Sequence, residues 1–443
     1  MSFIGIFLVN KMKKRRIFLP LFIVQGYLCF TLLIYMFGPV QFETHNPFLF
    51  YSLMIFYLLA FACGYLVGAF TENVGQIHRK ERRFSNSLFY VTFFLGLVMV
   101  LGTYKNLMLG ESLIPFDIFK EVSRGIREPG LAYAERMGKI SAGDTSGSRL
   151  FNILSLGFSF TKLLFIVICL YFWSDFSFFK KLLAGIYCLL FLSAGFASGT
   201  NAVVFIFVIF FVISGVCILF IRENRNFKKY VGILSILVLL PILSFGFIMS
   251  RRGGAFDYFA GTSPLGDITI SLVTPDYSGY FSIVLYSMVW LNYYLVQGYY
   301  GFSLILHLDH NWTYGFGNSA FLQRQMEVVF GIDISNLTFQ SRISDKWDVS
   351  AQWHSFYGQM ANDVGLIGVG FLMLFLGLFL SKVWISVIYR NSFYGLALLP
   401  IFGILIFFIP ANNQVFGYLD TFSYAIIVTI FWFFEDKKMR FLR

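Results

Sequence analysis

The sequence predicts an all-α polytopic membrane protein, and two of its features lead to that fold class. Hydrophobic residues make up 58% of the 443 positions and charged residues 13%, whereas a soluble protein is about a quarter charged and less than half apolar. The apolar residues also gather in runs that are long enough to cross a bilayer. This composition excludes a soluble enzyme, a disordered chain and a disulfide scaffold.

Ten apolar runs of about 17 to 25 residues stand out, and each is expected to form one transmembrane helix, because backbone groups in lipid must bond within their own segment. The first run follows a basic segment, as in a signal peptide. It is long and has no small-residue cleavage site after it, so we expect it to be retained. The predicted spans are 17–37, 48–70, 88–104, 151–173, 182–198, 201–221, 231–250, 364–381, 393–410 and 419–434.

The distribution of basic residues predicts the orientation and an even number of spans. With a cytoplasmic N-terminus, the inner segments carry 21 basic and 6 acidic residues, and the outer segments carry 12 basic and 17 acidic residues. Basic residues favour the cytoplasmic side of a membrane, so we expect both termini there. The net charge of +11 is then an orientation signal. It indicates a lipid bilayer as partner and no nucleic acid.

One further apolar stretch, 280–306, does not fit the alternation of charges. Its Tyr and Trp content suits a membrane interface, so we expect a re-entrant or in-plane helical segment; an eleventh span is the alternative. The expected organisation is 1–250 with seven spans and an outer loop at about 105–150, then 251–363 as a large outer loop. Residues 364–443 follow with three spans and a basic cytoplasmic tail.

A pair of arginines at the outer end of the seventh predicted span is the first candidate for function. Arg251 and Arg252 are followed by Gly253 and Gly254. A guanidinium presents a planar set of donors that matches phosphate oxygens, and the glycines would let backbone N–H groups approach an anion. The arginines could therefore clamp a lipid pyrophosphate. The alternative is an interfacial anchor whose charged ends reach water.

The segment that enters the eighth predicted span is the second candidate. It contains His354, Tyr357 and Asp363, and a histidine with a carboxylate at a membrane interface suits proton transfer. His354 and Tyr357 are three residues apart, so they would share one face of a helix. The alternative is a polar helix cap, with Asp363 favoured by the N-terminus of the span.

Other polar groups are less specific. The run Gly315-Phe316-Gly317-Asn318, with Arg324 after it, lies near aromatic residues that could stack on sugar rings or anchor at the interface. Lys162 lies near the middle of a predicted span, where a charge must face a cavity or find a partner. His307, Asp309 and His310 are weak candidates for a metal site, and the five cysteines fall within predicted spans as small core residues.

These motifs together resemble the bacterial O-antigen polymerase (Wzy) and O-antigen ligase superfamily. The resemblance rests on the ten-odd spans, on Arg-Arg-Gly-Gly at the start of a large late outer loop, and on the block His354-x-x-Tyr357-x-x-x-x-x-Asp363-x-Gly365-x-x-Gly368. The runs 294–301 and 314–318 look like the polymerase branch. Many members carry an arginine in the turn after the fifth span, where this chain has Ser198-Gly199-Thr200-Asn201. That departure puts more weight on other arginines, among them Arg124, Arg127 and Arg149.

The resemblance implies a GT-C-like membrane glycosyltransferase that works at the periplasmic face of the inner membrane without a metal or other cofactor. It would transfer a growing polysaccharide from undecaprenyl pyrophosphate to a lipid-linked repeat unit, with a chain-length-determining co-polymerase as partner. In this scheme Arg251 and Arg252 hold the pyrophosphate with support from Arg324, and Asn318 and Tyr357 bind substrate. His354 acts as general base or orients the acceptor hydroxyl, and Asp363 orients His354. The alternatives are an O-antigen ligase, which transfers to lipid A–core, and a transporter or flippase of lipid-linked sugars.

Overall fold

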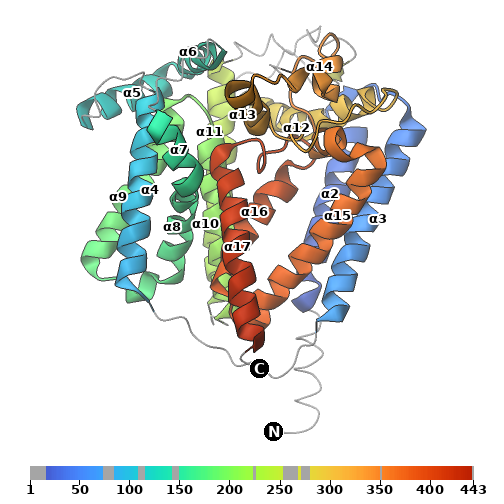
Figure 1. The fold of residues 1–443 in the computed structure, drawn as a ribbon. Helices are drawn as coiled ribbons and strands as arrows, with labels where there is room; N and C mark the ends of the chain where they lie inside the picture. Colours follow the sequence, from blue (N-terminus) through green and yellow to red (C-terminus); the bar gives the residue numbers. More distant parts are fainter. Residues whose placement is uncertain are drawn as a thin grey trace.

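The computed structural model describes residues 16–72, 84–107, 115–141, 149–222, 226–252, 268–270, 280–349 and 352–441. These residues form a bundle of long helices and, at its upper end, a cap of shorter helices and loops (Figure 1). The first helix of the bundle begins and the last helix ends at the opposite, lower end (Figure 1).

Every predicted span overlaps one or two helices of the bundle, so the fold is that of an all-α polytopic membrane protein. Seven of the described helices are long and apolar enough to cross a membrane, and one shorter apolar helix, α16, accompanies them. The predicted span 151–173 contains two helices, α7 and α8, which join at Ser159. The bundle consists of α2 (Leu19–Phe37), α3 (Pro47–Thr71), α4 (Asn86–Leu107), α7 (Arg149–Phe158), α8 (Phe160–Tyr171), α9 (Phe178–Ala197), α10 (Ala202–Ile221), α11 (Phe227–Arg252), α15 (Phe356–Arg390), α16 (Phe393–Phe408) and α17 (Leu419–Phe441).

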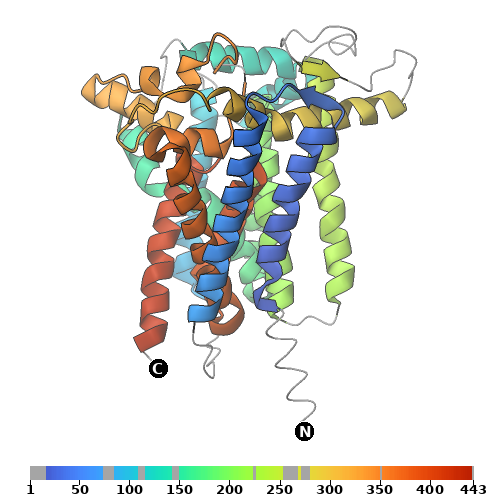
Figure 2. The ribbon, with the colours of Figure 1, turned by 90° about the vertical axis from the view of Figure 1, so that its right-hand side faces the viewer.

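The cap contains five helices, four of which lie in segments expected to be loops. They are α5 (Pro115–Arg127), α6 (Pro129–Ser141), α12 (Tyr280–Leu304), α13 (Ala320–Phe330) and α14 (Phe339–Arg342). Helix α12 corresponds to the aromatic stretch 280–306, and it lies across the upper ends of the bundle helices rather than alongside them (Figure 2). It contacts α11, α2 and α15.

Serine, asparagine and glycine define several helix ends. The Ser355 side chain accepts a hydrogen bond from the N–H of Gly358 at the start of α15, at 3.3 Å. Ser392 does the same for Gly395 at the start of α16, at 2.9 Å. Helix α13 ends at Gly331, whose φ of 66° is the left-handed conformation that commonly ends a helix. These short polar residues satisfy backbone groups that a helix end leaves unpaired.

Helices α3 and α15 pack backbone against backbone. A Cβ atom on Gly64 would lie 1.8 Å from the carbonyl oxygen of Leu374, and one on Gly377 would lie 2.1 Å from that of Phe61. Small residues at such a crossing let membrane helices approach closely and gain dispersion contacts. Helix α15 is therefore packed tightly against α3, and this contact fixes the position of the cap segment at the start of α15.

The start of α15 is separated from its membrane-spanning part by a break at Gly365. This residue has φ 69° and ψ 172°, which a residue with a side chain rarely adopts. The complete helix has 35 residues, or about 52 Å at 1.5 Å per residue, which exceeds the thickness of a bilayer core. The break lets the first two turns of α15 belong to the cap.

A short β-ladder connects the α2–α3 turn to the segment Ile268–Ile270. Strand β1 (Val40–Phe42) pairs antiparallel with β2 (Ile268–Ile270), and Val40 faces Ile270 across the ladder. The sequence analysis did not predict these strands. The ladder adds a link between the cap and the first helix of the bundle.

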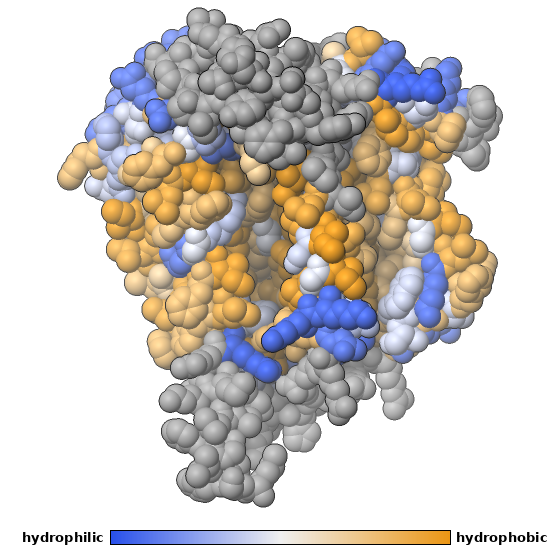
Figure 3. All heavy atoms as spheres, turned by 180° about the vertical axis from the view of Figure 1, so that it is seen from behind, coloured by the Kyte–Doolittle hydropathy of each residue, from blue (hydrophilic) through white to orange (hydrophobic). Residues whose placement is uncertain are grey.

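Apolar side chains form the middle of the surface, and hydrophilic side chains gather toward its two ends (Figure 3). At the lower end Arg390 is 5% exposed and forms ion pairs with Glu72 at 3.2 Å and with Asp436 at 2.9 Å. Both carboxylates are themselves less than 10% exposed. This buried cluster ties α15 to α17 and to the end of α3.

Candidate functional site

The Asp363 carboxylate joins the start of α15 to the cap loop 313–318. Its Oδ1 atom accepts hydrogen bonds from the Thr313 hydroxyl and from the N–H groups of Gly315 at 2.9 Å and Gly317 at 3.1 Å. Its Oδ2 atom accepts from the backbone N–H of Asn318 at 2.9 Å and from the Asn318 side chain at 2.7 Å. Five donors therefore surround one carboxylate, which fills its acceptor capacity.

Asn362 makes a second set of links from the same turn of α15. Its side-chain oxygen accepts from the N–H of Phe339 at 2.8 Å, and its NH₂ group donates to the carbonyl of Gly317 at 2.9 Å and to Gln340 at 2.7 Å. The backbone oxygen of Asn362 lies 2.9 Å from His310 Nε2. Two consecutive side chains thus hold the loop 307–318 and α14 on α15.

The fixed loop presents two aromatic rings at its surface. Trp312 is 62% exposed and Tyr314 is 65% exposed, and their rings are stacked with centroids 5.3 Å apart. Tyr314 has a φ of 57°, a left-handed conformation that costs a residue with a side chain about 1–2 kcal/mol. Its two neighbours, Thr313 and Gly315, both donate to Asp363, so the network maintains the strained residue. Such strain is commonly kept at binding sites.

His354 does not occupy the position expected of a general base. It is 4% exposed, and its buried Nε2 atom has no hydrogen-bond partner among the described residues. Burial lowers the pKa of its imidazole to about 3, and the nearby Asp348 offsets only part of that effect. An imidazole with this pKa is a weak proton acceptor without access to substrate.

The expected pairing of Asp363 with His354 is also replaced by another arrangement. The Asp363 oxygens receive their hydrogen bonds from the loop 313–318, and the charge that acts on His354 is that of Asp348. His354 lies before the N-cap residue Ser355, whereas Asp363 lies about two turns into α15, so the two side chains meet different neighbours. Asp363 therefore positions a loop rather than a catalytic base.

The side chains of Tyr357 and Asn318 are also engaged in contacts within the protein. Tyr357 is 2% exposed, and its ring packs against Tyr57, Tyr299 and Phe302 with centroids 4.9, 6.4 and 6.1 Å away. The Asn318 side chain donates to Asp363 and to the carbonyl of Gly315. Tyr357 is therefore closed to substrate, and the half-buried Asn318 uses its side-chain NH₂ group within the network; both lie in the segments that the motifs indicated.

Of the three arginines expected to bind pyrophosphate, only Arg324 has a side chain in the described part of the structure. Arg324 is exposed on α13 and makes no hydrogen bond or ion pair with another described residue. Arg251 and Arg252 are the last two residues of α11, at the cap end of the bundle (Figure 1). Their side chains are outside the described part of the structure, as are Gly253 and Gly254.

Arg124 is engaged within the cap. It forms an ion pair with Glu135 of α6 and lies 3.6 Å from Glu121 on its own helix, and these carboxylates raise the pKa of the guanidinium. Arg127 ends α5, and the side chain of Arg149 is outside the described part. Within the residues described, no three His, Cys, Asp or Glu side chains gather as metal ligands, so His307, Asp309 and His310 do not form such a group.

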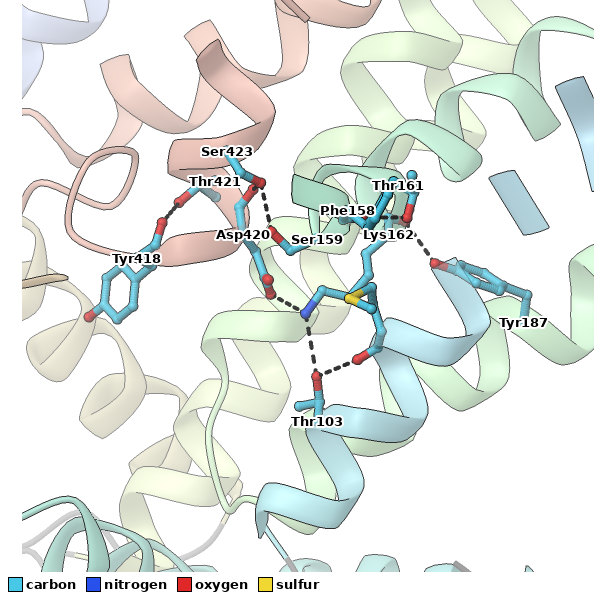
Figure 4. Close-up of polar contacts among 11 residues, drawn as sticks. Thr103, Phe158, Ser159, Thr161, Lys162, Tyr187, Tyr418, Asp420, Thr421 and Ser423 are labelled. Carbon is cyan, nitrogen blue, oxygen red and sulfur yellow. Dashed lines mark hydrogen bonds and ion pairs between the residues drawn. The ribbon is translucent and has the colours of Figure 1, made fainter. Parts of the chain in front are cut away.

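Lys162 has a charged partner that the sequence analysis did not identify. Its ammonium forms an ion pair with Asp420 of α17 and lies 3.3 Å from the hydroxyl of Thr103 on α4 (Figure 4). Its backbone oxygen accepts from the Tyr187 hydroxyl at 3.0 Å. Lys162 lies in the first turn of α8, and Thr103 is about one turn from the cap end of α4. The side chain thus carries its charge from the middle of the predicted span toward the cap.

The lysine and its carboxylate line a cavity of about 60 Å³. Thr103 and Thr421 also line it, although the Thr421 hydroxyl donates to the backbone oxygens of Gln414 and Val415. The remaining lining is apolar and comes from α4, α8, α9 and α10. Lys162 is 8% exposed, whereas Asp420 is 40% exposed. An acidic residue at the start of the last span was the available signal for this pair, because a lysine within a span needs an opposite charge at a similar depth.

No family model matches the chain, and no curated protein or solved structure matches it.

Proposed function

We propose that this chain is a membrane glycosyltransferase that extends a lipid-linked polysaccharide at the outer face of a bacterial inner membrane, as an O-antigen polymerase does. The observation that carries the proposal is the meeting of two motif segments that are far apart in the sequence. The loop 314–318 and the block that begins at His354 both belong to the resemblance, and Asp363 joins them through four hydrogen bonds, with a fifth from the adjacent Thr313.

The stacked pair Trp312 and Tyr314 supports a saccharide as substrate. Flat aromatic faces offer apolar contact to the C–H faces of sugar rings, and their edges leave hydroxyl groups free for water. The loop 307–318 contains Asp309 and no lysine or arginine, a composition that does not favour anionic lipid headgroups. Asp363 and Asn362 hold these rings outward, which lowers the entropy that binding would cost.

The reaction that we propose needs few protein groups. The bond between the anomeric carbon of the polysaccharide and the pyrophosphate oxygen breaks, and the acceptor hydroxyl oxygen bonds to that carbon. The acceptor proton passes to an oxygen of the leaving pyrophosphate, so a buried His354 is not required as base. Cations near the phosphates stabilise the developing charge, and Arg251, Arg252 and Arg324 are the candidates at the cap end.

The test is the lipopolysaccharide pattern of a strain that lacks its own polymerase. Wild-type protein is expected to give a full ladder, and Asp363→Ala and Arg251→Ala/Arg252→Ala are expected to leave one repeat unit on the core. Asp345→Asn, a change at an exposed residue of the cap, is the matched control and should keep the ladder. If removal of the protein from its own host leaves no repeat unit at all, the enzyme is a ligase. An unchanged ladder in that host contradicts both assignments.

A further inference from the structure

The ion pair of Lys162 and Asp420 differs from a purely structural pair in how much of its bonding capacity is used. An ammonium group has three N–H donors. Those of Lys162 have two described acceptors, the carboxylate of Asp420 and the hydroxyl of Thr103. No other described residue accepts from this ammonium, and the group lines a cavity.

The buried arginine at the other end of the bundle provides an internal comparison. Arg390 meets two carboxylates, Glu72 and Asp436, and all three side chains are less than 10% exposed. That cluster has more negative than positive charge and does not need a further anion. Lys162 has one carboxylate, and this carboxylate, Asp420, is 40% exposed on its other side.

The cavity has the size and the surroundings for a phosphate group attached to a lipid. Its 60 Å³ correspond to about four to six water-sized groups, and a phosphate has five non-hydrogen atoms. Lys162 supplies a charged contact at one side, next to Thr103, while Phe191 and Ile206 belong to the apolar remainder of the wall. This combination suits the junction between a charged headgroup and a long hydrocarbon chain.

The depth of the ammonium is also consistent with a lipid headgroup. Thr103 lies 17 residues after the start of α4, or about 25 Å along a helix, in a bilayer whose hydrocarbon core is about 30 Å thick. Asp420 is the second residue of α17 and likewise lies at its outer end. The charged pair is therefore close below the level at which the outer leaflet places its phosphates.

We propose that this cavity binds the phosphate group of a polyisoprenoid lipid, and that Lys162 is the cation that contacts it. Asp420 neutralises the lysine when the cavity is empty, because an unpaired charge at this depth is costly. The third N–H of the ammonium then bonds to a phosphate oxygen while the ion pair persists. The choice of a polyisoprenoid lipid rests on the proposed function; the phosphate rests on the cavity and its lysine.

The experiment measures binding of undecaprenyl pyrophosphate to the full-length protein in phosphatidylcholine nanodiscs. Wild type and Lys162→Arg are expected to bind, and Lys162→Met is expected to bind about 10- to 100-fold more weakly, which is the contribution of one charge-assisted hydrogen bond. The double variant Lys162→Met/Asp420→Leu replaces the pair by apolar groups and should fold as wild type does. This double variant provides the binding test if Lys162→Met fails to fold. Arg390→Met controls for general loss of stability, and among its folded molecules binding should remain.

Two comparisons identify the source of the phosphate. Inorganic pyrophosphate and phosphatidylglycerol, each supplied at the same concentration, should compete weakly with undecaprenyl pyrophosphate. Equal competition by either one would overturn the assignment to a polyisoprenoid lipid. Wild-type affinity in the folded double variant would show that the pair is only structural and would overturn the site. Lysine-dependent binding without a polysaccharide ladder would support the site and reject the proposed polymerase, whereas a normal ladder without such binding would reject the site alone.

Discussion

The cap at Asp363 and the bundle interior at Lys162 use a carboxylate in opposite ways. Asp363 has five donors on its two oxygens and no remaining capacity. Asp420 faces one ammonium, is 40% exposed, and lies beside a cavity. A saturated carboxylate fixes geometry, while an ion pair with spare donors can take part in binding. The number of bonds that a charged group already makes thus separates a positioning role from a ligand-binding role.

The largest effect is expected from removing the saturated carboxylate. Asp363→Ala leaves several N–H groups of the loop 313–318 without their acceptor, and hydrogen bonds to charged groups contribute about 1.5–3 kcal/mol each without being additive. We expect a loss of about 3 kcal/mol or more in stability of the cap, and cleavage within 307–318 in limited proteolysis. Asp345→Asn is the control. A cap that resists protease as well as wild type does would show that the network is dispensable.

The two halves of the ion pair should differ in how much their removal destabilises the fold. Asp420→Asn leaves the 8% exposed Lys162 charge uncompensated, and an unpaired buried charge costs about 3–5 kcal/mol. Lys162→Met leaves Asp420, which is 40% exposed, so its cost should be lower. Thermal unfolding in detergent measures both. Equal destabilisation would mean that Asp420 is buried in the membrane as deeply as the lysine is.

Acid should weaken the protein through His354. This histidine has a pKa of about 3 in the folded state and about 6.5 when unfolded, so the unfolded chain binds a proton that the folded one excludes. The stabilisation is complete above pH 6.5 and is lost as the pH falls toward 3. At pH 5 the loss is about 2 kcal/mol. Thermal unfolding at pH 7.5 and 5 measures it, and His354→Asn should remove this part of the dependence. An unchanged pH dependence in that variant would place the titration elsewhere.

The smallest expected change is at the strained tyrosine. Tyr314→Gly removes the cost of a left-handed residue, about 1 kcal/mol, so stability should be equal or slightly higher. Chain extension should nevertheless fall, through a higher KM for the saccharide, because one of the two stacked rings is lost. Phe330→Ala, a change at another exposed ring of the cap, is the control. Unaltered kinetics in Tyr314→Gly would remove the stacked pair from the saccharide site.

The sequence predicted the bundle well, because a long apolar run in lipid has few structural choices. Each predicted span lies on a helix, and the aromatic stretch 280–306 forms a helix across the end of the bundle (Figure 2). The cap was less predictable. Helices α5 and α6 and the pairing of β1 with β2 depend on contacts between distant segments, which no local pattern contains.

The site residues were likewise predictable in part: their segments were predicted, and the roles of their side chains were not. The motifs located the right segments, since Asn318 and Asp363 do meet. The roles of the side chains were harder to infer, because a short spacing such as that of His354 and Tyr357 does not indicate whether they face substrate or core. Both proved to be buried. Asp420 was missed because it lies 258 residues from Lys162 in the chain; its place at the end of the last span makes it a candidate partner, but only the fold brings the two together.

The β1–β2 ladder can form only after more than half of the chain has been synthesised, because its two strands are far apart in the sequence. Val40 must remain without its partner until Ile270 has been synthesised and has reached the cap end of the bundle. At translation rates of about 5–20 residues per second, those intervening residues take roughly 10 to 50 s. The first two helices of the bundle are therefore made with an open strand edge at the turn between them, and that edge is paired only after β2, which follows α11, has been synthesised.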